Sequence, residues 1–107
     1  MIRMTLAELA DAVSGRLETF GDDSAATTVA GTVDTDSRLL GPGDIFVAKP
    51  GETTDGHLFV DAVAQAGAAL AIVERTVEAP ITQIVVADVV EALAALAQTV
   101  VARVRAG

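Results

Sequence analysis

The chain has 107 residues with 15 acidic and 7 basic side chains, which gives a net charge of −8. This length predicts one domain, and a hydrophobic content of 51% excludes a disordered tail. Nucleic acids and anionic membranes are bound by clustered Lys and Arg, so we expect neither partner. With no cysteine and one histidine, we expect no disulfide and no metal site. No apolar targeting or membrane-spanning segment stands out, which predicts a soluble, cytoplasmic protein.

The first third of the sequence predicts one helix followed by two strands. Thr5 and Glu8 have the spacing of a capping box, and apolar residues at helical spacing follow. We therefore predict a helix over residues 6–14, ended by Gly15 in the left-handed conformation. The next predicted elements are a short strand over 16–20, a polar loop over 21–26 and a strand from Thr27 to the region 34–36.

The middle of the sequence predicts a tight turn followed by alternating strands and helices. In Gly41-Pro42-Gly43-Asp44, proline fixes one φ angle and the next glycine accepts a positive φ, as a type II turn requires. The predicted elements after this turn are a buried strand over 45–48, a loop over 49–56, a helix over 58–66 closed by Gly67, and strands over 70–73 and 83–86.

A long helix is predicted at the end of the chain. Asp88 is its expected N-cap, with Glu91 three residues later. One apolar stripe follows, formed by Val89, Leu93, Leu96, Val100 and Val104. Strand–helix–strand units with apolar strands imply parallel pairing covered by helices. We therefore predict a single α/β domain over residues 1–107, with a mixed, mostly parallel β-sheet flanked by helices.

Two common nucleotide-binding motifs are absent from the sequence. The only lysine, Lys49, is followed by Pro50-Gly51 and cannot belong to a phosphate-binding G-x-x-x-x-G-K-[ST] loop. The segment Gly41-Pro42-Gly43 lacks the third glycine of a dinucleotide-binding turn. We assign no catalytic residue and expect no nucleoside triphosphate hydrolysis by this chain alone. An anionic ligand would depend on Lys49, Arg38, backbone N–H groups or a helix N-terminus.

Several polar residues allow more than one interpretation. His57 could act as a general base, although a lone histidine at a helix start is more often a structural hydrogen-bonding group. Ser37, His57 and Asp36 could form a hydrolytic triad, but their presence alone is weak evidence. Asp34 and Asp36 would share one face of a strand as a metal-binding pair, yet no third ligand is evident. Arg38 could bind a phosphate or carboxylate, or form a buried salt bridge with a nearby Asp.

Five short segments, taken in order and with their spacing, carry a resemblance to a known family. They are Asp34-Thr35-Asp36-Ser37-Arg38, Gly41-Pro42-Gly43-Asp44-Ile45-Phe46-Val47-Ala48, Gly51-Glu52, Asp55-Gly56-His57-Leu58-Phe59 and Ala66-Gly67-Ala68. Together they resemble the N-terminal domain of the Mur ligases, ATP-dependent amide ligases that build the peptide of bacterial peptidoglycan. The resemblance extends over about residues 4–105. It is stronger to the member that adds D-alanyl-D-alanine, whereas Lys49-Pro50-Gly51 is closer to the member that adds the third residue.

The resemblance implies a substrate-docking role. In this family the N-terminal domain binds the UDP end of a UDP-N-acetylmuramoyl-peptide. Carried over by motif, the UDP site comprises Thr35, Ser37 and Arg38, with Glu52, Thr53 and Thr54 on a facing loop. The resemblance also implies that ATP and Mg²⁺ serve the full-length enzyme and that its central and C-terminal domains are the partners of this one. We therefore expect the chain to be one part of a larger bacterial ligase. A non-catalytic interaction domain and a hydrolase using Ser37 and His57 are the alternatives.

Overall fold

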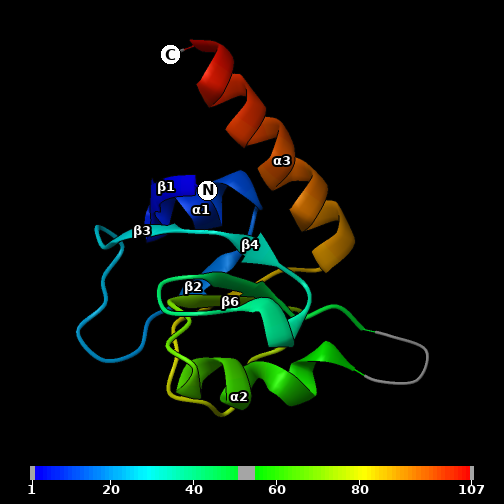
Figure 1. Cartoon of the computed structure of the whole chain (residues 1–107). Coiled ribbons are helices and arrows are strands. Elements are labelled where there is room, and N and C mark those ends of the chain that lie inside the picture. Colours follow the sequence, from blue (N-terminus) through cyan, green and yellow to red (C-terminus); the bar gives the residue numbers. More distant parts are fainter. Residues whose placement is uncertain (1, 51–54, 107) are drawn as a thin grey trace.

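Five strands form the central sheet, in the order β2-β7-β6-β5-β4 (Figure 1). The computed structural model describes residues 2–50 and 55–106. The strands are β2 (Arg16–Glu18), β4 (Val33–Asp34), β5 (Ile45–Val47), β6 (Leu70–Val73) and β7 (Gln83–Val85). Neighbouring strands from β4 to β7 pair in parallel, and β2 pairs antiparallel with β7. The predicted α/β class with a mixed, mostly parallel sheet is therefore confirmed.

Apolar side chains of the central strands alternate between the two faces of the sheet. Ile45, Val47 and Ile72 lie in a core shared with α1 (Leu6–Ala12) and α3 (Val89–Ala106). Phe46, Ala71 and Val73 lie in a second core, covered by α2 (Val60–Gln65). Figure 1 shows α2 on one side of the sheet and α1 and α3 on the other. Both faces are buried because parallel strands are covered by helices on each side, which explains their nearly unbroken apolar sequences.

A second, two-stranded sheet was not expected from the sequence. β1 (Ile2–Thr5) pairs antiparallel with β3 (Thr28–Gly31). The predicted strand from Thr27 to the region 34–36 is therefore two strands, β3 and β4, in different sheets. The chain passes from one sheet to the other at Thr32, whose N–H donates a hydrogen bond to Oδ1 of Asp44 over 3.0 Å. Neither the break nor β1 has a local sequence signal, because both depend on partners distant in the chain.

The first helix begins as predicted and ends earlier. The N–H of Thr5 donates a hydrogen bond to Oε1 of Glu8 over 2.9 Å, and the N–H of Glu8 donates one to Oγ1 of Thr5 over 3.1 Å. These two bonds confirm the capping box. The prediction of a left-handed Gly15 is wrong, since Ser14 adopts the positive φ of 54°. Glycine is required at position 15 for space: a Cβ there would lie 2.4 Å from Cγ2 of Ile84.

The central turn and the second helix follow the sequence more closely. Gly43 has a φ of 82°, and the N–H of Asp44 donates a hydrogen bond to the carbonyl oxygen of Gly41 over 3.2 Å. Both features confirm the type II turn. The helix predicted over 58–66 starts with a 3₁₀ turn, η2 (Gly56–Phe59), that continues into α2. Gly67, with a φ of 95°, closes it as predicted. A second 3₁₀ turn, η1 (Ser37–Leu39), was not predicted.

The last helix is only partly covered by the rest of the domain. Asp88 is the N-cap as predicted: its Oδ1 accepts the N–H groups of Val90 and Glu91 over 2.8 and 3.1 Å. Within the predicted apolar stripe, Leu96 is buried, whereas Val104 is 75% exposed. The C-terminal half of α3 extends beyond the sheet (Figure 1). Among residues 2–50 and 55–106, no helix has the length and hydrophobicity needed to cross a bilayer.

Candidate functional site

A pocket of about 530 Å³ lies where the parallel strands β4 and β5 end. One wall comes from the segment after β4 and contributes Thr35, Asp36, Ser37 and Arg38, and the other comes from the segment after β5 and contributes Lys49, Pro50, Gly56 and Phe59. In open α/β sheets, ligands bind beyond the carboxyl ends of the strands because the adjoining loops splay apart there. Three of the predicted binding residues therefore line one pocket together with the only lysine.

Hydrogen bonds between residues close in the chain shape the wall that follows β4. Strand β4 ends at Asp34, whose Oδ1 accepts the N–H of Asp36 over 2.9 Å. Asp36 is the N-cap of η1, and its Oδ1 accepts the N–H of Arg38 over 3.0 Å. The expectation that Asp34 and Asp36 share one strand face is wrong, because the chain turns between them. This turn directs the segment from Thr35 to Arg38 along one side of the pocket.

Arg38 and Asp36 form a two-point ion pair on this wall. The Nε–H group of Arg38 donates a hydrogen bond to Oδ1 of Asp36 over 3.0 Å, and an N–H group on Nη2 donates one to Oδ2 over 2.9 Å. These guanidinium hydrogen bonds and the Arg38 N–H lower the pKa of Asp36 to about 2. The predicted pairing of Arg38 with a nearby Asp is correct, but it is not buried: the Arg38 side chain is 86% exposed. An exposed guanidinium remains accessible to an anion as well as to Asp36.

The opposite wall is held close to the sheet by Gly56. The N–H of Gly56 donates a hydrogen bond to the carbonyl oxygen of Lys49 over 3.0 Å. A Cβ at position 56 would lie 2.7 Å from the backbone nitrogen of Lys49, so only glycine fits without a shift. The predicted binding residues Glu52, Thr53 and Thr54 belong to this segment and lie outside the described residues. Their assignment stays a prediction.

His57 is a buried structural residue behind this wall. Its side chain is 1% exposed. Nε2 accepts the N–H of Glu74 over 2.8 Å, which assigns the proton of the neutral ring to Nδ1; that nitrogen lies 2.7 Å from Asp55 Oδ1. Since both ring nitrogens are engaged, the structural interpretation of His57 is confirmed. The triad with Ser37 and Asp36 is wrong, because His57 bonds elsewhere and Asp36 pairs with Arg38.

The carboxylate of Asp55 and the end of β6 complete this support. Asp55 accepts the N–H of His57 over 2.9 Å, and its Oδ2 accepts Nη2 of Arg75 over 2.9 Å. The hydrogen bonds from His57 and then from Arg75 hold the pKa of Asp55 well below its usual range. Glu74 also accepts the N–H of Val89, at the start of α3, over 3.0 Å. The sequence analysis missed Glu74 and Arg75, although both directly follow a predicted buried strand.

The composition of the pocket suits a polar, anionic ligand with one flat apolar part. Hydroxyl groups of Thr35 and Ser37 can donate and accept hydrogen bonds, and Lys49 and Arg38 supply positive charge. Phe59, which the sequence analysis named in a family-like segment but not as a binding residue, is 38% exposed and lines the pocket. An aromatic ring so placed can pack on a planar ligand group. Within the described residues, no group of three acidic or histidine side chains could hold a metal ion.

Comparisons with known proteins agree on one family. The family described as "Mur ligase family, catalytic domain" matches residues 31–101. The UDP-N-acetylmuramoyl-tripeptide–D-alanyl-D-alanine ligase of Mycobacterium tuberculosis is 41% identical over 81 residues, which are 75% of this chain and 16% of that protein. The UDP-N-acetylmuramoyl-L-alanyl-D-glutamate–2,6-diaminopimelate ligase of Acidovorax is 60% identical over 47 residues, which are 43% of this chain and 9% of that protein.

A solved structure extends the similarity to the fold. The crystal structure of MurF from Acinetobacter baumannii superimposes with a TM-score of 0.76 at 37% identity, covering 90% of this chain and 20% of that one. The α/β architecture described above is therefore also present in one part of that MurF structure. The chain spans about a fifth of the length of these relatives or less.

Proposed function

Because the chain belongs to the Mur ligase family, we propose that it docks the UDP end of a UDP-N-acetylmuramoyl-peptide for an ATP-dependent peptidoglycan-precursor ligase. The favoured ligase adds D-alanyl-D-alanine, since relatives at 37–41% identity carry that name over most of this chain. The observation that carries the proposal is the pocket at the ends of β4 and β5, where two hydroxyls, Lys49 and the exposed Arg38–Asp36 ion pair meet.

Each part of this pocket matches one part of a uridine diphosphate. The hydroxyls of Thr35 and Ser37 can bond to the uracil edge or the ribose, because both offer donors and acceptors. The positive charges of Lys49 and Arg38 can attract the negatively charged diphosphate, which a chain of net charge −8 would otherwise repel. Phe59 offers a ring face to the base. Glu52, Thr53 and Thr54 are proposed to contact the ligand from the facing loop, as the family resemblance implies.

The chemical step would require parts of a ligase beyond this chain. In the proposed reaction the carboxylate of the muramoyl-peptide receives the terminal phosphoryl group of ATP, which leaves as ADP, and an amine attacks the resulting acyl phosphate to form the amide and release phosphate. The central domain would hold ATP and Mg²⁺ for that activation, and the C-terminal domain, the other partner, would complete the site for the amine. The residues of this chain would bind and orient the substrate at its nucleotide end, far from the reacting carboxylate. The proposed location is the bacterial cytoplasm.

An amide NMR titration of the 107-residue chain with UDP-N-acetylmuramoyl-tripeptide tests the proposal, with ATP as the control ligand. Docking predicts shifts confined to residues near 35–38 and 49–59, and none from ATP. Binding by one part of a larger site is expected on the order of 1 mM, or about −4 kcal/mol. Absence of shifts at saturating ligand would contradict docking and favour a non-catalytic interaction domain of the same fold.

Matched variants separate specific docking from nonspecific attraction. Ser37→Ala should weaken binding about 3- to 10-fold while the fold stays intact, because one hydrogen bond contributes about 0.5–1.5 kcal/mol. Ser24→Ala, in an exposed loop outside the pocket, is its control. Lys49→Gln should weaken binding similarly, whereas Arg3→Gln removes an equal charge from β1 with little effect. Equal losses for Lys49→Gln and Arg3→Gln would contradict the assignment of Lys49.

A second candidate is the ligase that adds the third residue of the peptide. The Acidovorax diaminopimelate ligase supports it, through 60% identity over a shorter stretch. The two candidates predict the same contacts to UDP and differ in the peptide that follows. Turnover by a full-length ligase that contains this chain would separate them: extension of UDP-N-acetylmuramoyl-dipeptide in preference to the tripeptide would favour the second candidate.

A further inference from the structure

One buried histidine joins the pocket wall that follows β5 to the end of β6. Gly56 and Phe59 belong to the short turn η2 and line the pocket. His57 lies between them in the turn but does not line the pocket, and its side chain is only 1% exposed. Its Nε2 accepts the N–H of Glu74, which directly follows β6, over 2.8 Å. This bond ties the turn to the sheet.

The sheet side of this bond is held in place by its own contacts. The pairing of β6 with β7 continues past Val73, whose carbonyl oxygen accepts the N–H of Val86 over 2.8 Å. The carboxylate of Glu74 accepts the N–H of Val89, the first residue of α3, over 3.0 Å. The end of β6 is therefore fixed to a neighbouring strand and to a helix. A change at His57 is consequently taken up by η2, which is a single short turn.

The turn η2 is coupled directly to residues that line the pocket. The N–H of Gly56 donates a hydrogen bond to the carbonyl oxygen of Lys49 over 3.0 Å. The two residues are in close contact, since a Cβ at position 56 would lie 2.7 Å from the backbone nitrogen of Lys49. Phe59 is the last residue of the same turn. Movement of His57 therefore shifts Lys49 and Phe59, the residues proposed to face the diphosphate and the base.

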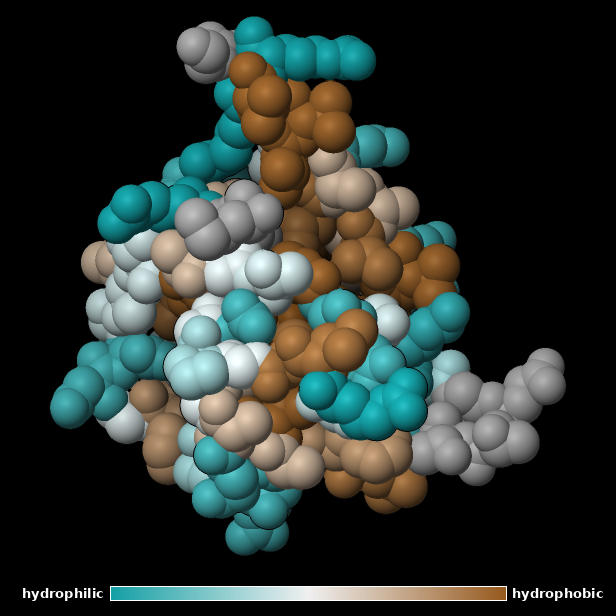
Figure 2. Space-filling view, viewed as in Figure 1, coloured by the Kyte–Doolittle hydropathy of each residue, from teal (hydrophilic) through white to brown (hydrophobic). Residues whose placement is uncertain are grey.

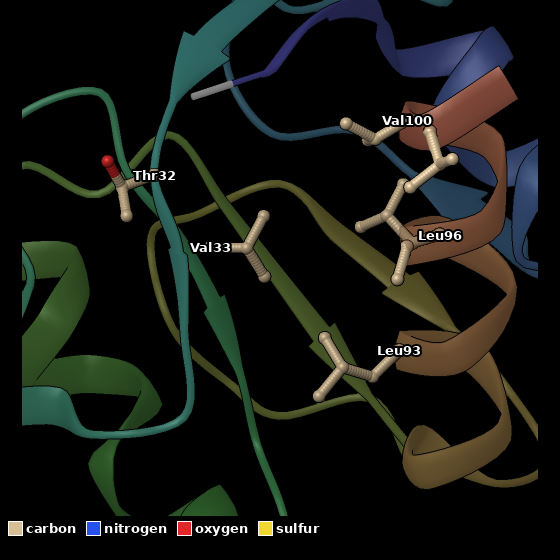
Figure 3. Close-up of a pocket in the computed structure, with 7 residues that line it drawn as sticks. Thr32, Val33, Leu93, Leu96 and Val100 are labelled. Carbon is tan, nitrogen blue, oxygen red and sulfur yellow. The ribbon is translucent and has the colours of Figure 1, made fainter. Parts of the chain in front are cut away.

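The wall that follows β4 is held by contacts that do not include His57. Strand β4 pairs in parallel with β5, and its first residue, Val33, packs against the core that contains Leu96 of α3. Figure 2 shows hydrophobic surface where α3 meets the body of the domain. Figure 3 shows Leu93, Leu96 and Val100 directed from α3 toward Val33. This wall should therefore keep its position when the other wall moves.

The bond to Glu74 exists only while the His57 ring is neutral. Nε2 is its acceptor, and Nδ1, which lies 2.7 Å from Oδ1 of Asp55, carries the proton. A second proton has to go to Nε2, which then becomes a donor and faces the donor N–H of Glu74. Histidine is the side chain that ordinarily changes charge between about pH 5 and 8. Among the described residues, the charged groups that hydrogen bonds bring near the ring are Asp55 beside it, Glu74 and Arg75 at the end of β6, and Lys49 after β5.

We propose that His57 is a proton-sensitive positioning residue: its neutral ring holds η2 in the arrangement that binds the nucleotide, and its protonation releases η2 and weakens binding. This inference rests on the proposed docking of the UDP end. Loss of the one hydrogen bond should weaken binding about 3- to 10-fold. Charge alone would have the opposite effect, because a chain that becomes less negative attracts an anion more strongly. That effect is small here, since Asp55 lies 2.7 Å from the ring and would pair with the new charge.

Amide NMR of the free 107-residue chain reports the movement itself. As the His57 ring is protonated, the amide signals of Lys49 and Phe59 should change with the same midpoint as the ring, whereas that of Ser37 on the other wall should change much less. In the His57→Gln variant, which has no proton to gain over this range, none of these signals should follow such a titration. Equal changes on the two walls would overturn the assignment of η2 as the part that moves.

Two uncharged replacements of His57 separate its bond to Glu74 from its bond to Asp55. His57→Gln places an amide oxygen near the position of Nε2, so it keeps an acceptor for the N–H of Glu74. It should retain the affinity for UDP-N-acetylmuramoyl-tripeptide within about 3-fold and lose the pH dependence. His57→Asn is one bond shorter, keeps only the link to Asp55, and should bind about 3- to 10-fold more weakly at every pH. Circular dichroism checks that both variants fold. Equal affinities of the two variants, or a pH dependence retained in His57→Gln, would overturn the inference.

Proton NMR of the His57 ring, with and without UDP-N-acetylmuramoyl-tripeptide, tests the coupling in the unaltered chain. His57 is the only histidine, so its ring signals need no separate assignment. Since binding and protonation must change each other by the same factor, saturating ligand should lower the midpoint of the ring titration by about 0.5–1 pH unit. The diphosphate of this ligand is esterified at both ends and lacks the ionisation near pH 6 of a phosphate monoester. An unchanged or raised midpoint in the bound chain would overturn the inference and leave docking intact, whereas absence of binding would overturn both.

Discussion

Replacing His57 by phenylalanine tests the structural role that the geometry assigns to this ring. Phenylalanine keeps a planar ring in the buried site and removes both ring nitrogens. The N–H of Glu74 then loses its acceptor at 2.8 Å, which costs about 1–3 kcal/mol for a donor left without a partner. Loss of the bond to Asp55, which is 32% exposed and can turn to water, adds about 1 kcal/mol. The expected decrease in the free energy of unfolding is about 2–4 kcal/mol.

Urea denaturation followed by far-UV circular dichroism is the appropriate assay, because the chain has no Trp or Tyr for fluorescence. Arg75→Gln is the matched control. It removes the other partner of Asp55, an arginine whose side chain is 60% exposed, and should cost less than about 1 kcal/mol because exposed ion pairs contribute little. A loss below about 1 kcal/mol for His57→Phe, or one no larger than that of Arg75→Gln, would refute the reasoning.

Two further predictions concern the walls of the pocket. The Arg38 guanidinium holds the pKa of Asp36 at about 2, below the ordinary 3.8, so the pair stabilises the fold above about pH 4 and loses that effect as the pH falls toward 2. Arg38→Gln should raise the Asp36 pKa toward 3.8 in a carboxyl ¹³C NMR titration; an unchanged pKa would contradict the ion pair. Gly56→Ala should lower the free energy of unfolding by about 1–3 kcal/mol, since its Cβ meets backbone atoms of Lys49. Gly41→Ala, whose Cβ would contact only the Asp44 carboxylate at 3.9 Å, should change it by less than about 0.5 kcal/mol; similar losses for both would contradict the packing argument.

Local sequence patterns predicted all three α-helices and four of the five strands of the central sheet, whereas β4 was merged with β3 into one predicted strand. The strand over 70–73 has the predicted bounds, because a short apolar run between polar residues permits little else. The capping box at Thr5 and the N-cap at Asp88 fixed two helix starts through contacts within three residues. Features set by distant partners were missed. β1 pairs with a strand more than twenty residues away, and Gly15 is glycine because of Ile84.

The residues of the candidate site also divide into those that the sequence predicted and those that it missed. Thr35, Ser37 and Arg38 were named from the family resemblance, and the structure brings them into one pocket with Lys49. The sequence could not show that Asp36 turns the chain there, because the preceding β-type pattern continues through it. The support behind the pocket was also missed. His57 finds its second partner 17 residues away at Glu74, and no local spacing signals such a bond.

Glu74 explains how the pocket and the last helix are both fixed to the sheet. It directly follows β6, the middle strand, which pairs with neighbours on both sides. Its backbone N–H supports His57 behind the pocket, and its carboxylate accepts the first N–H of α3, from Val89. Because different groups of one residue make these two bonds, the removal of the carboxylate would loosen the start of α3 and leave the His57 bond in place. The pocket and the start of α3 are thus each anchored to the centre of the fold through different groups of one residue.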